Sequence, residues 1–209
     1  MIRIAGLLIS VIAAYLLGSI PTSFILTRLF AGTDIRAHGS GNVGATNVLR
    51  VVGKLPALAT LIIDISKGVL AVTLLAQASY PFIKDIDYEL ARILLGLSAI
   101  SGHIWTIFLK FKGGKGVATT IGVLAVLAPS IFIPSILVWL AVFVATNFVS
   151  TASLSFGLAL PIFALIESKS VYLIIFSVTL CFINSYKHRA NILRLIRGEE
   201  PKTYIFKSS

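Results

Sequence analysis

The residues best suited to chemistry stand in a short turn between two apolar segments, Phe111-Lys-Gly-Gly-Lys-Gly116. Lys112 and Lys115 supply compact positive charges. Glycines expose backbone N–H groups and permit positive φ, which suits close approach to a phosphate. The glycines of this turn are Gly113, Gly114 and Gly116. Because a further apolar segment starts directly after the turn, the N-terminal N–H groups of a helix should point into it as well.

The order of residues in this turn differs from that of a nucleotide-binding P-loop. A Walker A loop places Ser or Thr directly after its lysine, whereas Gly116 follows Lys115 here. The flanking segments also have the composition of membrane helices. The turn therefore predicts a phosphate site at a membrane surface rather than nucleotide hydrolysis.

A second polar stretch, Asp34 to Arg50, is rich in glycine, hydroxyl and amide groups. Its glycines spell G-x-G-x-x-G, but no strand precedes them, so a dinucleotide site is not expected. Arg36 and Arg50 can form bidentate pairs with phosphate. Smaller donors are Ser40, Asn42, Thr46 and Asn47. The alternative is a glycine-rich turn in which the Ser and Asn side chains serve as caps.

Ionisable residues also occur outside these turns. Asp64 and Lys67 lie three residues apart inside an apolar segment, where a mutual ion pair and a Lys67 directed at an anion site are both open. His188 and Asn191, in the basic stretch 186–200, share one helical face and can address one bound molecule. A basic helix lying on lipid explains the arginines of that stretch equally well. His103 is expected to be an interfacial packing residue.

The elements that position these residues are apolar. With 57% hydrophobic and 12% charged residues and a mean hydropathy of +0.97, the chain of 209 residues is predicted to be an all-α integral membrane protein. We expect one domain over residues 1–209, with a tight turn between Pro129 and Pro134. Seven membrane helices are predicted: Ile4–Phe30, Ala57–Ala78, Leu90–Leu109, Val117–Ala128, Ile131–Phe148, Thr151–Ile166 and Val171–Ser185.

Orientation follows from the basic residues. With seven spans, 13 of the 18 lysines and arginines fall on the side that holds all three polar stretches. The opposite links hold Arg3, Lys84 and Lys169, beside several carboxylates. The positive-inside rule then puts the N-terminus outside and the C-terminus in the cytoplasm. Half of the excess positive charge is assigned to attraction for anionic lipid headgroups, and the clustered remainder to an anionic substrate.

Three ordered motifs resemble those of the bacterial membrane acyl-phosphate:glycerol-3-phosphate acyltransferase family. They are Gly39-Ser-Gly-Asn-Val-Gly-Ala-Thr-Asn47, Phe111-Lys-Gly-Gly-Lys-Gly-Val-Ala-Thr119 and His188-Arg-Ala-Asn191, the last followed by Arg194, Gly198 and Glu199. The resemblance implies a seven-helix enzyme of the bacterial inner membrane with its site on the cytoplasmic face. It implies transfer of an acyl group from acyl phosphate to the 1-position of glycerol 3-phosphate, giving lysophosphatidic acid and phosphate for phospholipid biosynthesis.

The resemblance also implies roles for individual residues. Substrate phosphates are assigned to Ser40, Arg50, Lys115, Ser153, His188 and Asn191, with Lys112, Asn42 and Lys67 in support. An acyl phosphate already has a good leaving group, so direct transfer without an acyl-enzyme is expected. His188 and a substrate phosphate are both candidate proton acceptors. We expect no metal, cofactor, nucleic acid or obligate protein partner.

Two other functional classes stay open at this point. A transporter for a phosphate-bearing metabolite would also need cytoplasmic cations, although transporters often show internal repeats and bind near the midplane. We find no repeat in the sequence. A structural lipid-binding membrane protein is the third reading.

Overall fold

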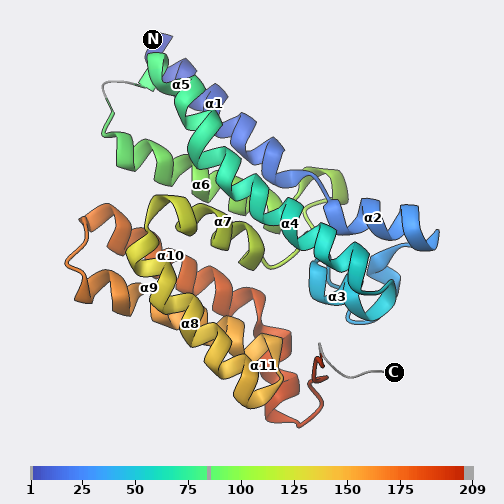
Figure 1. Cartoon of the computed structure of the whole chain (residues 1–209). Helices are drawn as coiled ribbons and strands as arrows, with labels where there is room; N and C mark the ends of the chain where they lie inside the picture. Colours follow the sequence, from blue (N-terminus) through green and yellow to red (C-terminus); the bar gives the residue numbers. More distant parts are fainter. Residues whose placement is uncertain (1, 84–85, 205–209) are drawn as a thin grey trace. The chain divides into compact units, whose positions relative to one another are not determined.

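A computed structural model describes residues 2–83 and 86–204, and every regular element in this part of the chain is helical (Figure 1). Lys84, used above for orientation, lies outside the described residues, as does the side chain of Arg3. The longer helices are α1 Ile2–Ser19, α2 Thr22–Ala31, α3 Ala45–Val51, α4 Lys54–Leu70, α5 Ala76–Ile83, α6 Tyr88–Ile104, α7 Val117–Leu127, α8 Pro129–Thr146, α9 Val149–Ile166, α10 Val171–Lys187 and α11 Arg189–Ile196. Three short helical pieces are η1 Ile35–Ala37, η2 Ala71–Leu75 and η3 Ile107–Leu109.

The chain forms two compact units, residues 1–127 and 128–209. The single domain expected for 1–209 stays a prediction. The prediction of an all-helical membrane fold is confirmed for the described residues, whereas the number of spans is not. Among the described residues, five helical segments are long and apolar enough to cross a membrane, and the bent pair α10–α11 makes a sixth if it is counted as one span. The helix α7 is apolar but shorter.

The first apolar segment is not the continuous helix predicted over Ile4–Phe30. It breaks at Ile20–Pro21, where α1 ends and α2 begins. Proline has no N–H and its ring clashes with the preceding turn, so the helical ladder is interrupted there. Buried carbonyl groups left by such a break need donors inside the protein. Thr106 donates to the Ser19 carbonyl oxygen at 2.5 Å, and Lys67 donates to that of Ile20 at 2.5 Å.

The predicted tight turn at Pro129 and Pro134 is wrong. Helix α7 ends at Leu127, Pro129 opens α8, and Pro134 lies inside that helix. The fixed φ of proline suits the first position of a helix. Inside a membrane helix, the carbonyl group that a proline leaves without its usual donor can be satisfied by neighbouring groups. Neither proline therefore marks the link between these segments.

Small residues set the close packing of the first unit. Within this unit α1 packs on α6 and α4 packs on α7 (Figure 1). A Cβ at Gly18 would collide with the backbone of Ala99, and one at Gly68 would collide with the backbone of Thr119. Glycine lets membrane helices approach until their backbones touch, so dispersion contacts replace the missing hydrophobic driving force. These contacts fix the end of α6, which carries the glycine-rich turn.

The second unit is a bundle of α8, α9 and α10 with a short basic helix after it (Figure 1). The helices α10 and α11 meet at His188 with a bend of 57°. The basic helix predicted after the last span is thus confirmed over Arg189–Ile196. The bend places His188 between two helices instead of on the face of one.

Candidate phosphate-binding site

The stretch 34–50 folds around the side chain of Asn47, which is 1% exposed. Its amide nitrogen lies within hydrogen-bond distance of the carbonyl oxygens of Ile35, His38 and Asn42, at 3.0–3.3 Å. Its amide oxygen accepts the N–H of Ser40 at 3.0 Å. The Asn47 side chain therefore stabilises the turn, which agrees with the alternative that Asn side chains serve as caps in this stretch. The sequence did not separate Asn47 from the phosphate-binding candidates beside it.

The same loop leaves other polar groups at its surface. The side chains of Ser40 and Arg50 are exposed and that of Asn42 is half-buried. Arg36 forms a bidentate pair with Asp34, with closest atoms 2.6 Å apart, and lies over the ring of Phe24. Hydrogen bonds from Arg36 lower the pKa of Asp34 to about 2. A phosphate would have to compete with this carboxylate for Arg36.

The glycine-rich turn is anchored to the end of α6 by its backbone. The N–H of Gly113 donates to the Ile104 carbonyl oxygen at 3.1 Å, and that of Gly114 donates to the His103 carbonyl oxygen at 3.0 Å. Gly116 has φ +84°, a conformation that side chains disfavour. Lys112 is exposed and Lys115 half-buried. The turn thus presents two lysines from a rigid backbone directly before α7.

Loop and turn meet inside the first unit. Leu109, just before the turn, packs into a buried cluster with Ile35, Val43 and Val48 of the loop. A Cβ at Gly114 would lie 2.5 Å from the carbonyl oxygen of Val43. The structure therefore brings together two of the three stretches that the sequence indicated, the one that carries Ser40, Asn42 and Arg50 and the one that carries Lys112 and Lys115.

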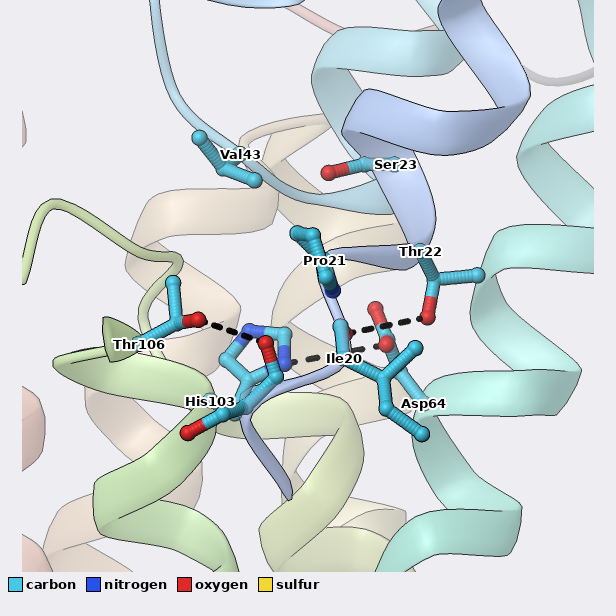
Figure 2. A pocket seen from close by; sticks show the side chains of 9 residues that line it. Ile20, Pro21, Thr22, Ser23, Val43, Asp64, His103 and Thr106 are labelled. Atoms are coloured by element: carbon cyan, nitrogen blue, oxygen red, sulfur yellow. Dashed lines mark hydrogen bonds and ion pairs between the residues drawn. The ribbon is translucent and has the colours of Figure 1, made fainter. Parts of the chain in front are cut away.

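A buried group of ionisable residues, Asp64, Lys67 and His103, lies beside this region. The Lys67 ammonium is 2.7 Å from the Asp64 carboxylate, and both side chains are at most 3% exposed. The mutual pairing that the sequence left open is thus present. On the other side, His103 Nδ1 is 3.7 Å from the same carboxylate. Asp64 and His103 border a small pocket that is also lined by Ser19, Ile20, Pro21, Thr22, Ser23, Val43 and Thr106 (Figure 2).

In the second unit, Ser153 and His188 are joined through Asn184. The Asn184 amide donates to the Ser153 carbonyl oxygen at 2.8 Å, and the Asn184 carbonyl oxygen is 2.9 Å from His188 Nδ1. A carbonyl oxygen only accepts, so Nδ1 carries the proton and a neutral imidazole has its lone pair on Nε2. The Ser153 hydroxyl donates to Val149 and accepts from the Trp139 indole.

In the third motif, the carboxylate that binds Asn191 and Arg194 is that of Glu200 and not that of its neighbour Glu199. Glu200 is 8% exposed and accepts hydrogen bonds from Asn191 at 2.6 Å and from Arg194 at 2.7 Å. Burial raises the pKa of Glu200, but the hydrogen bonds from Asn191 and Arg194 and the charge of Arg194 outweigh burial, so the net shift of this pKa is downward. Glu199, which was aligned with the family motif above, is exposed. The carboxylate that orients Asn191 therefore comes one residue later.

Sequence reasoning missed His103, Asn184 and Glu200. A usable signal existed for Asn184, because it precedes His188 by four residues and so shares its helical face. His103 was interpreted as a packing residue, since nothing local relates it to Asp64. Glu200 could not be told from Glu199, because burial and not residue type separates the two.

The described residues carry the means to bind phosphate and to accept a proton. The first unit joins two lysines, Arg50, hydroxyl groups and a helix N-terminus, and the second holds an imidazole with a fixed tautomer. Such groups suit a reaction in which charged substrates are positioned and a good leaving group departs.

Comparison with known proteins agrees with this chemistry. The family model described as glycerol-3-phosphate acyltransferase matches residues 8–198. A glycerol-3-phosphate acyltransferase of Prochlorococcus marinus (strain MIT 9215) is 45% identical over 195 residues, which cover 92% of this chain and 95% of that protein. One of Desulforamulus reducens is 40% identical over 202 residues, with 97% of each chain covered.

Solved structures show the same likeness. A crystal structure of PlsY (YgiH), an integral membrane glycerol 3-phosphate acyltransferase in its glycerol 3-phosphate form, matches with a TM-score of 0.85 and 35% identity over 96% of this chain and 99% of that one. Its lysophosphatidic acid form gives a TM-score of 0.81 at 34% identity, with 95% of each chain covered. The extent of these matches, together with the three ordered motifs, shows that the chain belongs to the glycerol-3-phosphate acyltransferase family.

Proposed function

We propose that this protein transfers a fatty acyl group from acyl phosphate to the sn-1 hydroxyl of glycerol 3-phosphate, giving lysophosphatidic acid and inorganic phosphate. Family membership makes the chain an acyltransferase. The observation that carries the choice of substrates is the packing of the lysine-bearing glycine turn against the loop of Ser40 and Arg50. Both substrates of this reaction bear phosphate, and the two stretches together supply the cations that phosphates require.

The proposed reaction is a direct transfer. The glycerol hydroxyl oxygen attacks the acyl carbonyl carbon, a new ester C–O bond forms, and the bond from that carbon to the phosphate oxygen breaks. The hydroxyl proton passes to His188 Nε2 or to a phosphate oxygen, and inorganic phosphate leaves with the electron pair. The cations lower the barrier by holding two anions together and by stabilising the charge that develops.

Six residues are proposed to contact the substrate phosphates or the reacting groups: Ser40, Arg50, Lys115, Ser153, His188 and Asn191. Lys112, Asn42, Arg36 and the turn glycines are proposed to support them. Lys67 is assigned an internal role, because its ammonium is already engaged by Asp64 and by the Ile20 carbonyl oxygen.

The decisive assay offers three acyl donors to the purified chain with glycerol 3-phosphate: palmitoyl phosphate, palmitoyl-CoA and a palmitoyl thioester of acyl carrier protein. We expect lysophosphatidic acid and phosphate from palmitoyl phosphate alone. Product formed from a thioester but not from palmitoyl phosphate would overturn the donor assignment. Uptake of glycerol 3-phosphate into vesicles without product would support the transporter in its place.

The proposed location is the bacterial inner membrane, with seven spans, the N-terminus outside and the active site on the cytoplasmic face. The count of seven includes the short helix α7, and thinned membrane would accommodate its 11 residues. The distribution of lysines and arginines supports the orientation. In intact cells a cysteine at Lys169 should react with an impermeant thiol reagent and one at Lys202 should not. The reverse pattern would refute the orientation.

A further inference from the structure

A chain of polar contacts crosses the first unit from the break in the first segment to the glycine turn, and Figure 2 shows the part of it that joins Asp64 to His103. Lys67 donates to the carbonyl oxygen of Ile20 and to Asp64, and Asp64 faces His103 Nδ1 at 3.7 Å. Buried ions within membrane helices are costly unless they are paired and serve a purpose. The proposed acyl transfer does not use any of these three side chains directly.

The far end of this chain of contacts lies against the turn. The other ring nitrogen of His103, Nε2, fills the space that a Cβ of Gly114 would need. The backbone of His103 accepts the N–H of Gly114, and the next carbonyl group accepts that of Gly113. The ring therefore lies between a buried carboxylate and the backbone that carries Lys112 and Lys115.

We propose that His103, oriented by Asp64, is a positioning residue that fixes the glycine turn in its phosphate-binding conformation. It acts through the backbone of the turn and does not touch the substrate. This inference rests on the proposed function, because it assigns phosphate binding to that turn. It explains why position 114 is glycine: the imidazole packs on a backbone without a side chain, and the carbonyl oxygen of Val43 closes the other side.

The test measures phosphate binding without turnover. Equilibrium dialysis of the purified full-length chain with radiolabelled inorganic phosphate gives the affinity, and steady-state kinetics give KM and kcat. We expect His103→Ala to weaken phosphate binding by about tenfold and to raise KM for the substrates more than it lowers kcat. Asp64→Asn should have the same effect to a smaller extent, and His103→Asn, which keeps a donor towards Asp64, should retain more affinity than alanine.

Ser98→Ala is the matched control. Ser98 lies five residues earlier on α6 and donates to the Val11 carbonyl oxygen at 2.7 Å, so its removal also deletes a contact between helices. We expect its phosphate affinity to equal that of the wild type. If His103→Ala and Ser98→Ala lower thermal stability alike and both retain wild-type phosphate affinity, His103 is only structural and the inference fails.

A double variant separates positioning from an independent contribution. If His103 acts through the turn, His103→Ala combined with Lys115→Ala should lose little more phosphate affinity than Lys115→Ala by itself. Losses that multiply would overturn the inference. Where His103→Ala does not fold, the same cycle is run with His103→Asn. A wild-type chain that binds phosphate but makes no lysophosphatidic acid would refute the proposed function and leave the binding comparison to decide the role of His103.

Discussion

Gly113→Ala tests the glycine turn most directly. Gly113 does not have positive φ, so alanine is not disfavoured there by its backbone conformation. The obstacle is space, because a Cβ would lie 2.9 Å from the Ile104 carbonyl oxygen and closer still to that of His103. Both obstacles are backbone atoms at the end of α6, which cannot rotate away as a flexible side chain would.

The size of the effect follows from this geometry. To reach an ordinary contact distance the turn must move away from α6 by roughly 1 Å, and a misplacement of about 1 Å can cost on the order of 10²-fold in rate. The movement also strains the backbone hydrogen bonds of Gly113 and Gly114. We expect kcat/KM with palmitoyl phosphate and glycerol 3-phosphate to fall about 100-fold, mainly through KM.

The assay is steady-state release of phosphate by the purified variant beside a control, Gly32→Ala. Gly32 has φ +64° and no atom lies within 4 Å of the position that a methyl group would take, so alanine there costs about 1–2 kcal/mol of backbone strain and meets no neighbour. Gly32→Ala should therefore be less stable but keep its KM. A folded Gly113→Ala variant with wild-type KM and kcat would remove the turn from the substrate site.

Three further changes test other parts of the site. Lys115→Ala should lower kcat/KM by the equivalent of about 2–5 kcal/mol in steady-state assays, because a bound phosphate loses a charge-assisted partner. The comparison variant is Arg36→Ala, which removes a guanidinium that is paired with Asp34. A loss for Lys115→Ala no larger than that for Arg36→Ala would contradict this prediction. The contribution of Glu200 to stability should be present in full above its ordinary pKa of 4.5 and be lost as pH falls through its lowered folded-state pKa. Thermal unfolding curves of the wild type should show this loss and those of Glu200→Gln should not, and equal pH dependence would refute the assignment. Cys181→Ala should keep wild-type turnover, and mass spectrometry should find no acylated protein after palmitoyl phosphate alone; an acyl adduct would overturn direct transfer.

The sequence by itself determined which segments are helical and which stretches are polar. Apolar runs of nearly 20 residues can only form helices in a membrane, since each backbone group must be paired within its own segment. The observed bounds of α7, α9 and α10 lie within two residues of those predicted from the apolar runs. The glycine turn and the polar stretch that carries His188 and Asn191 were also readable, because residue types are local properties of the chain, although the position of His188 between two helices was not predicted.

The tertiary structure decided which of several similar residues hold the loop and the third motif in place. Asn47 and Asn42 have the same chemistry, and only the fold buries Asn47 among the carbonyl groups of its own loop. Glu199 and Glu200 differ only in which of them reaches Asn191. The hydrophobic pattern of the sequence cannot predict which of two like residues is buried and hydrogen-bonded, because a buried hydrogen bond depends on the approach of atoms within about 3 Å.

The break in the first segment also depends on both the local sequence and the tertiary structure. Pro21 made an interruption possible, but the donors that satisfy it, Lys67 and Thr106, come from residues 47 and 87 positions away from their acceptors. The pairing of Asp64 with His103 likewise joins separate helices. These contacts depend on glycine-mediated packing that brings α1 against α6 and α4 against α7, and no local pattern in the sequence encodes that approach.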